Sequence, residues 1–211
     1  MKTTGLLAFL FLQIALFILP ARAEEGWTTL FNGKNLEGWT ADLSKCEVKA
    51  VDGEIHITAG KNLWYRTTVE MKDFILEAEF KLPEGKGMAN NSGLAFRGKL
   101  KGKASKPNAY QCEVDNTPRN YSGAIYNIGK GWIYPKKDEA KPMQEKVGKA
   151  YKLHQWNHFK IQCQGDHIKT WVNGIPIADI HDKTYDSGFF AIQHHGGKGV
   201  FKFRNLRVKK L

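Results

Sequence analysis

The residues best suited to chemistry in this chain are three polar side chains that alternate along one short segment. Gln111, Glu113 and Asp115 are separated by the apolar Cys112 and Val114. Successive side chains of an extended strand point to opposite faces, so the amide and the two carboxylates share one face. Carboxylates can act as general bases or acids, and an amide can hold a hydroxyl or carbonyl group of a ligand.

Two other segments carry polar residues in the same manner. Gln193 and His195 share one parity of their segment, opposite large apolar residues, and Arg97 has the parity of the small Gly93 and Ala95. Small neighbours leave room for a ligand to approach the guanidinium group. If these three segments are neighbouring strands, they form a concave surface that combines two carboxylates, two amides, an imidazole and a guanidinium.

A solvated sheet face is the competing interpretation, because it also alternates polar with apolar residues. Asp, Gln and His are less typical of such a face than Lys, Thr, Ser and Glu, which favours a functional groove. His195 has its own alternative, since the following Gly196 and Gly197 are typical of a turn that it would cap. The other histidines follow no metal-ligand spacing, and a metal held by Glu113 and Asp115 has no supporting pattern. We therefore predict neither a metal nor a cofactor.

The elements that must position these residues are short strands. Period-two alternation dominates the chain, and Asn173-Gly174 predicts a two-residue hairpin turn, because such a turn needs positive φ at both positions. Strands are predicted at residues 74–82, 92–97, 110–116, 156–164, 167–172, 175–180, 189–195 and 200–208. These short strands, the glycine-rich turns and the absence of a break in composition predict one all-β sandwich.

The segment 127–154 is the exception to this alternation. It is polar and lysine-rich, contains two prolines and has no clear period, so its length calls for an explanation. Its Trp132 and Tyr134 could form a lid over a site. A surface excursion with a short helix around residues 143–149 is an equally good interpretation.

The N-terminal residues 1–23 are typical of a secretory leader rather than of folded structure. Lys2 precedes an almost wholly apolar stretch of 14 residues, and Ala21-Arg22-Ala23 matches the small-x-small pattern of a cleavage site. The stretch is shorter than the roughly 20 residues that a membrane-spanning helix needs. We expect export to the periplasm or the exterior, no stable membrane insertion, and a single mature domain at residues 24–211.

The distribution of charge and of cysteines argues against nucleic-acid binding and against a disulfide. Lys and Arg number 32 against 21 Asp and Glu, but the lysines are spread, and the densest set, at positions 99–106, has no interleaved aromatic residues. A solvated basic loop is therefore favoured, and nucleic-acid binding is not predicted. The three cysteines form no CxxC pair, which favours small buried thiols over a disulfide.

A series of short motifs, in order along the chain, resembles the 3-keto-disaccharide hydrolase domain family. The motifs are GWTTLFNGKNLEGW (26–39), NSGLAFR (91–97), YQCEVDN (110–116), SGAIY (122–126), WN (156–157), WVNG (171–174), IQHHGG (192–197) and FRNL (203–206). This resemblance implies a concanavalin A-like jelly-roll β-sandwich of two antiparallel sheets. It also implies hydrolysis of glycosides whose sugar has been oxidised to a ketone at C3, so that the partner is a 3-keto sugar.

The implied reaction assigns roles to the residues singled out above. A C3 ketone acidifies the hydrogen on C2, so that a base can remove it, the C1 substituent can leave by elimination, and water can then add. Glu113 or Asp115 would be the base and His195 the acid. Stabilising donors would come from Arg97, Gln111 and Gln193, and further sugar contacts from Tyr126 and Trp132.

Two rival functions use the same groove. A retaining β-glucanase needs a second carboxylate about 5 Å from the first, and Thr117 and Pro118 stand where it should fall, which disfavours that reaction. A non-catalytic carbohydrate-binding module would bind a glycan against Trp132, Tyr134 or Trp171 without cleaving it. The enzyme would release the C1 substituent of the sugar, whereas the module would leave it attached.

Overall fold

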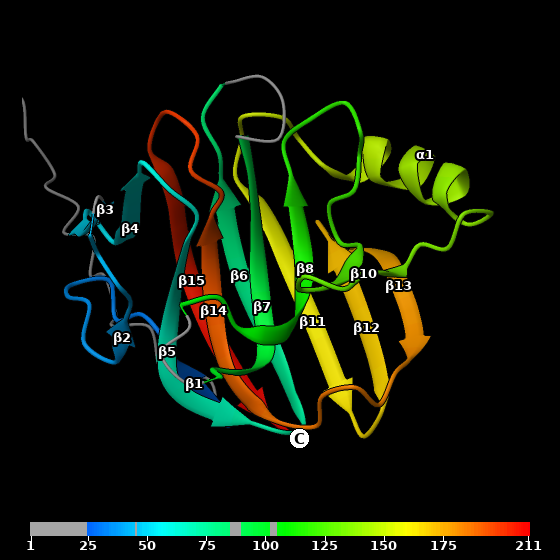
Figure 1. The fold of residues 1–211 in the computed structure, drawn as a ribbon, viewed down its shortest axis with the longest axis horizontal. Coiled ribbons are helices and arrows are strands. Elements are labelled where there is room, and N and C mark those ends of the chain that lie inside the picture. Colours follow the sequence, from blue (N-terminus) through cyan, green and yellow to red (C-terminus); the bar gives the residue numbers. More distant parts are fainter. Residues whose placement is uncertain (1–24, 45, 85–89, 102–104) are drawn as a thin grey trace, which may run out of the picture.

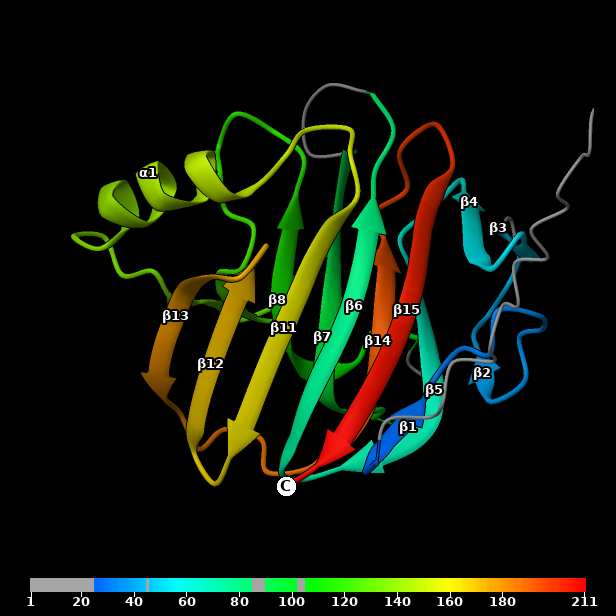
Figure 2. The same cartoon turned by 180° about the vertical axis from the view of Figure 1, so that it is seen from behind.

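The computed structural model describes residues 25–44, 46–84, 90–101 and 105–211, so the predicted leader lies outside the described residues. Two antiparallel sheets pack face to face and form a jelly-roll sandwich (Figures 1 and 2). We call the sheet nearer the viewer in Figure 1 the front sheet and the other the back sheet. The front sheet consists, in spatial order, of β10 (Gly131–Tyr134), β9 (Ile125–Asn127), β8 (Asn108–Asp115), β7 (Asn91–Lys99), β14 (Gly188–His194), β5 (Leu63–Met71) and β2 (Trp39–Thr40).

The back sheet faces the viewer in Figure 2. Its strands are, in order, β13 (Ile175–His181), β12 (His167–Val172), β11 (Asn157–Gln164), β6 (Phe74–Lys81), β15 (Phe201–Lys210), β4 (Glu54–Ala59) and β3 (Cys46–Val51), and β1 (Trp27–Thr29) pairs with β15. All eight segments in which strands were predicted form strands, with ends that differ by at most three residues. The predicted all-β sandwich is confirmed.

The core forms where the predicted apolar parity of each strand turns inward. On β6, Leu76, Ala78 and Phe80 are fully buried, while the residues between them are partly exposed. Tyr110 and Cys112 of β8 enter the same core from the front sheet. All three thiols of the chain are free; two of them are buried, as predicted, and Cys46 is partly exposed.

The predicted Asn173-Gly174 turn is present. Asn173 has a φ of +49° and Gly174 a φ of +81°, and Val172 pairs directly with Ile175 across the turn. Positive φ at both turn positions matches the twist of the two flanking strands, which is why the hairpin register is set here. A second hairpin of the same kind joins β3 to β4.

The irregular segment contains the helix that was one of its two predicted interpretations. Helix α1 spans Ala140–Ala150 and packs beside β13 at the edge of the sandwich (Figure 1). Met143, Val147 and Ala150 are buried because their spacing places them on one face of the helix. No helix of the described part is long and apolar enough to cross a membrane.

Three central strands of the front sheet are buried on both faces, unlike the strands of the back sheet. Every residue of β14 and nearly every residue of β7 and β8 is buried. The outer face carries a second, smaller apolar cluster, made of Trp64, Ala95, Ala109, Ile128, Phe189 and Ala191. This outer face, between the small cluster and the end of β8, holds the candidate site.

Candidate functional site

A pocket of about 300 Å³ opens on the outer face of the front sheet. Its lining comes from six strands of the front sheet and the turns beside them: Asn62, Trp64, Asn91, Lys106, Gln111, Glu113, Arg119, Tyr126, Ile128, Gly129, Trp132, Gln193 and His195. Gly93 pairs directly with Glu113, and Ala95 with Gln111, so the polar parities of neighbouring strands lie on one face. Six of the eight predicted site residues therefore meet in one pocket: Gln111, Glu113, Tyr126, Trp132, Gln193 and His195.

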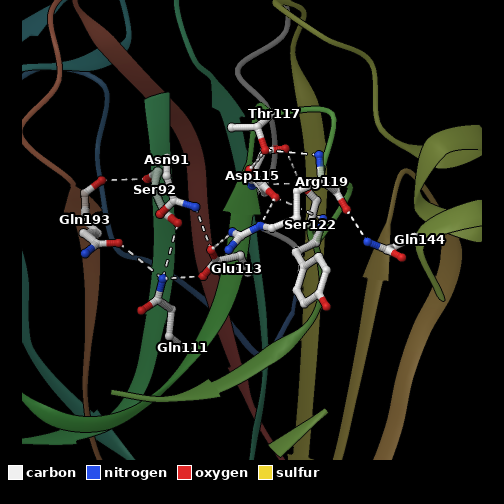
Figure 3. A network of polar contacts seen from close by, with 11 residues as sticks. Asn91, Ser92, Gln111, Glu113, Asp115, Thr117, Arg119, Ser122, Gln144 and Gln193 are labelled. Atoms are coloured by element: carbon white, nitrogen blue, oxygen red, sulfur yellow. Dashed lines mark hydrogen bonds and ion pairs between the residues drawn. The ribbon is translucent and has the colours of Figure 1, made fainter. Parts of the chain in front are cut away.

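Glu113 is the centre of the polar network at one end of the pocket (Figure 3). Its Oε1 accepts hydrogen bonds from Asn91 Nδ2 at 2.6 Å and from Arg119 Nη2 at 2.7 Å. Its Oε2 accepts one, from Gln111 Nε2 at 2.8 Å. Three donors on two oxygens leave lone-pair capacity on the carboxylate, because a carboxylate has about four acceptor positions.

Burial tunes the basicity of this carboxylate. The residue is only 4% exposed. Burial raises the pKa of Glu113 to about 7, and the charge of Asp115 adds to the rise, whereas Asn91 and Arg119 oppose it. A group with a pKa near neutral pH can both take and return a proton, which is the property required of a general base or acid.

A chain of amides extends from Glu113 across three strands. Gln111 Nε2 also lies 3.2 Å from Gln193 Oε1, and Gln193 Nε2 donates to Asn62 Oδ1 at 3.2 Å. The chain needs Gly93, because a Cβ there would lie 2.3 Å from Gln111 Nε2. The room that Gly93 leaves is thus occupied by the Gln111 side chain, not by an approaching ligand as the sequence suggested.

Asp115 has the predicted parity but does not line the pocket. The turn that follows β8 folds back over it, and its side chain is fully buried. Asp115 Oδ2 accepts from Arg119 Nε at 2.8 Å, and Oδ1 accepts from the Thr117 hydroxyl at 2.7 Å. Its position makes it a support for Arg119 rather than a group that can touch a ligand.

The predicted position of Arg97 in this groove is wrong. A register shift between Phe96 and Lys99 and a φ of +53° at Arg97 break the alternation of β7. The buried guanidinium points to the far end of the strand, where Nε and Nη2 donate to the carbonyl oxygen of Lys72 and Nη1 donates to that of Tyr185. It borders a separate cavity there. Strand parity fails at a bulge because one extra residue reverses the faces.

The two adjacent histidines have different environments, as their opposite parities predict. His195 lines the pocket, and partial burial together with the charge of Arg119 lowers its pKa. His194 is in the core, stacked on Phe201 with ring centroids 3.8 Å apart. Its Nδ1 accepts the backbone N–H of Gly196 at 3.0 Å, so His194 rather than His195 is the residue that caps the turn.

Aromatic residues line the pocket from two sides of the front sheet. The rings of Tyr126 and Trp132 lie 4.9 Å apart, and Trp64 faces the same space from β5. Of the aromatic residues considered for glycan binding, Trp132 lines the pocket. Trp171 lies on the back sheet beneath the Lys160 ammonium group, 4.9 Å from its ring centroid. It is therefore part of the outer surface of that sheet.

Several lining residues were missed by the sequence reasoning. Arg119 lies in a turn and has no strand parity, and Asn62 lies just before β5, outside the polar strands considered. Asn91 was quoted only within a motif. Lys106 reaches the pocket from the predicted solvated loop, and its side chain is exposed. The one available signal for Arg119 was its position four residues after Asp115, an opposite charge close in sequence.

The described residues contain no cluster of three or more His, Cys, Asp or Glu side chains that could hold a metal ion. The chemistry of the pocket thus rests on one carboxylate, one imidazole, one guanidinium, one ammonium group and several amides. This set can exchange protons and can donate hydrogen bonds to a bound oxygen.

The comparisons with known proteins concern both the sequence and the fold. Residues 26–209 match the family described as 3-keto-alpha-glucoside-1,2-lyase-like domain. No curated protein matches the chain.

Among solved structures, two proteins of Parabacteroides distasonis ATCC 8503, each provisionally described as a glycosyl hydrolase, are similar. The first has a TM-score of 0.65 at 18% identity, over 89% of this chain and 94% of that one. The second has a TM-score of 0.62 at 23% identity, over 88% and 99%. The carbohydrate-binding module CBM66 of Bacillus subtilis has a TM-score of 0.57 at 17% identity, over 82% and 96%. At these identities the likeness concerns the fold.

Proposed function

The chain belongs to the 3-keto-alpha-glucoside-1,2-lyase-like domain family, and we propose from this membership and from the pocket that it cleaves glycosides whose sugar carries a ketone at C3. The observation that supports the proposal most directly is Glu113, a buried carboxylate with lone-pair capacity and a pKa of about 7 at the pocket surface. The word lyase in the family description favours elimination as the step that breaks the C1–O bond.

The reaction begins with proton transfer from carbon. A ketone at C3 makes the C2 hydrogen acidic, and Glu113 accepts this proton. The electron pair of the C2–H bond then forms the C1=C2 double bond as the C1–O bond breaks. Water added to this double bond, with OH on C1 and H on C2, completes a net hydrolysis.

The leaving oxygen needs a proton, and His195 is the group placed to supply it. In an α-glucoside the C2–H and C1–O bonds point to opposite faces of the ring, so base and acid must approach from different sides. Glu113 belongs to β8, whereas His195 follows β14, two strands away. A lowered pKa makes the His195 imidazolium a stronger acid toward the leaving oxygen.

The pocket disfavours ordinary retaining hydrolysis. That mechanism needs two carboxyl groups of the protein, about 5 Å apart, that flank the glycosidic bond to be cleaved. Glu113 is the one carboxylate among the described lining residues, because Asp115 is covered and committed to Arg119. A sugar already activated by a ketone needs no second carboxylate, which agrees with the residues present.

The test is cleavage of defined keto sugars. Purified protein incubated with 3-keto-trehalose, 3-keto-lactose or a nitrophenyl 3-keto-glucoside should release the aglycone together with the free 3-keto sugar or its unsaturated precursor. Glu113→Gln should lower turnover at least a hundredfold, while Glu47→Gln, a change at an exposed residue of β3, should not. Intact substrates with the unchanged chain would overturn the proposal.

A carbohydrate-binding module is the second candidate, and the aromatic residues that line the pocket, Trp64, Tyr126 and Trp132, favour it. Aromatic rings bind sugar faces without any need for catalysis. Calorimetric binding of the keto sugars together with their complete recovery would identify the module.

Export remains part of the proposal, and a mature N-terminus at Glu24 in material secreted by a bacterial host would support it.

A further inference from the structure

The proposed elimination leaves one requirement unassigned among the predicted residues. When the C2 proton leaves, its electron pair moves first onto the C3 oxygen, which becomes an enolate oxyanion. Hydrogen-bond donors fixed at that oxygen stabilise the developing negative charge and so lower the activation barrier of proton removal. Arg97, the predicted cation for this role, points away from the pocket and donates to backbone carbonyls. The Gln111 amide nitrogen is already shared among Glu113, Gln193 and the Ser92 carbonyl.

Arg119 has the geometry that this requirement demands. Its Nε donates to Asp115 Oδ2 at 2.8 Å, and its Nη2 donates to Glu113 Oε1 at 2.7 Å. None of the described residues accepts a hydrogen bond from Nη1. The side chain is 29% exposed and lines the pocket. One end of the guanidinium is thus bound to protein, and the other remains available to a ligand.

The guanidinium is held in a fixed orientation. Its carbon lies 4.8 Å from the ring centroid of Tyr121 and 5.5 Å from that of Trp132. The backbone carbonyl of Arg119 accepts a hydrogen bond from Gln144 of helix α1 at 2.9 Å (Figure 3). Donors that are oriented before the reaction stabilise a developing charge without a cost for reorganisation.

Arg119 lies next to Glu113, the proposed base, as the reaction requires. C2 and C3 are bonded, so the base that removes the C2 proton and the donor that binds the C3 oxygen must be neighbours. The contact of 2.7 Å between Glu113 Oε1 and Arg119 Nη2 satisfies this condition. Lys106 also lines the pocket, but its long side chain is exposed, and no carboxylate of the described residues forms an ion pair with it.

We propose that Arg119 is the catalytic residue that binds the C3 oxygen and stabilises the enolate, and that Asp115 is its positioning residue. In this step the C2–H bond breaks, the proton goes to Glu113, and the electron pair moves to the C3 oxygen opposite Arg119 Nη1. The pair then returns to form C1=C2 while the C1–O bond breaks and the leaving oxygen takes its proton from His195. The inference rests on the proposed function.

The test isolates enolate formation from bond cleavage. The probe is 1,5-anhydro-3-keto-glucitol in D₂O, which has an acidic C2 hydrogen but no aglycone at C1, and NMR follows the replacement of this hydrogen by deuterium. Arg119→Gln should slow exchange about 10²- to 10³-fold, the loss expected for one oxyanion donor. Arg119→Lys should be intermediate, because it keeps the charge without the planar fork. Asp115→Asn should slow exchange less than Arg119→Gln does. A saturating concentration of the probe should not fully restore its exchange rate.

Arg204→Gln is the matched control. Arg204 also pairs with a carboxylate, Glu79 at 2.7 Å, and its guanidinium carbon lies 4.0 Å from the ring centroid of Trp156, but it lies on the back sheet. Exchange by this variant should stay within about twofold of the unchanged chain, in keeping with an exposed pair. An equal loss in both arginine variants would overturn the inference, because a general loss of fold would explain it.

The outcomes separate the two proposals. If the unchanged chain neither exchanges the probe nor cleaves keto glycosides, the proposed function fails. If it does both and Arg119→Gln exchanges within threefold of it, only the role of Arg119 fails. If Arg119→Gln does not fold, Arg119→Lys is the deciding variant. If its melting temperature is close to that of the unchanged chain and its exchange rate is undiminished, the proposed role of Arg119 is overturned.

Discussion

Replacement of Glu113 by glutamine should change how the stability of the protein depends on pH. Burial raises the pKa of Glu113 from an ordinary 4.5 to about 7 in the folded chain. The folded state therefore holds this proton more tightly than the unfolded state does. The stabilisation is fully present below pH 4.5 and is lost as the pH rises through about 7. Glutamine is neutral throughout this range and removes the dependence.

The size of the effect follows from the two pKa values. Each tenfold change in proton affinity corresponds to ~1.4 kcal/mol, so a change from 4.5 to about 7 corresponds to about 3 kcal/mol. In a domain of this length, 1 kcal/mol moves the melting temperature by roughly 2–4 °C, and the whole effect is therefore roughly 6–12 °C. The other carboxylates titrate alike in the unchanged chain and in Glu113→Gln, so their contributions cancel in the difference between the two free energies of unfolding.

The assay is urea denaturation of the unchanged chain and of Glu113→Gln at several pH values from 4.5 to about 8. The difference between their free energies of unfolding should shift by about 3 kcal/mol, in favour of the variant as the pH rises. Glu47→Gln, at a residue whose side chain is 59% exposed, should show a flat difference. A difference for Glu113→Gln that stays constant within ~0.5 kcal/mol would refute the reasoning, because it would mean that Arg119 keeps Glu113 ionised.

Three further predictions concern the pocket and the strand beneath it. Turnover against pH should be bell-shaped and should fall above pH about 7, because the reactive form holds one proton between Glu113 and His195; a rate still rising at higher pH would contradict this. Cys112→Ser should lower the free energy of unfolding by ~1–3 kcal/mol, since it buries a poorly satisfied hydroxyl, and should leave turnover within about twofold; an inactive but stable variant would reverse the assigned faces. Gly93→Ala should displace the Gln111 amide, which would lie 2.3 Å from the new Cβ, and should lower turnover at least ~10-fold; unaltered turnover would show that the amide chain is dispensable.

The sequence was sufficient for β7, β8 and β14, the three central strands of the front sheet, because their alternation is regular near the pocket. Along Gln111, Glu113 and Gln193 the alternation predicts the outward face, and these residues do meet in the pocket. The hairpin at Asn173 was equally predictable, because few residues tolerate positive φ. In both cases a local rule determines the geometry, and no distant contact changes it.

The failures lie where local rules do not apply. Arg97 lies within a register shift in the pairing of β7 with β8, and no pattern in its own segment signals this shift. Arg119 comes from a turn whose path depends on the buried Asp115. The burial of Glu113 results from the three donors and the turn around it, so its raised pKa depends on tertiary contacts that periodicity does not contain.

The division of the front sheet into two faces has a practical consequence for protein engineering. On β7, β8 and β14 near the pocket, odd-numbered positions such as 91, 111, 113 and 193 face the ligand space, and even-numbered positions such as 94, 110, 112 and 192 belong to the core. A library that randomises the odd positions other than 113, which carries the proposed base, would explore new ligand specificities while it leaves the packing between the sheets intact. Gly93 should stay constant in such a library, because any side chain there would compete with Gln111 for the same space.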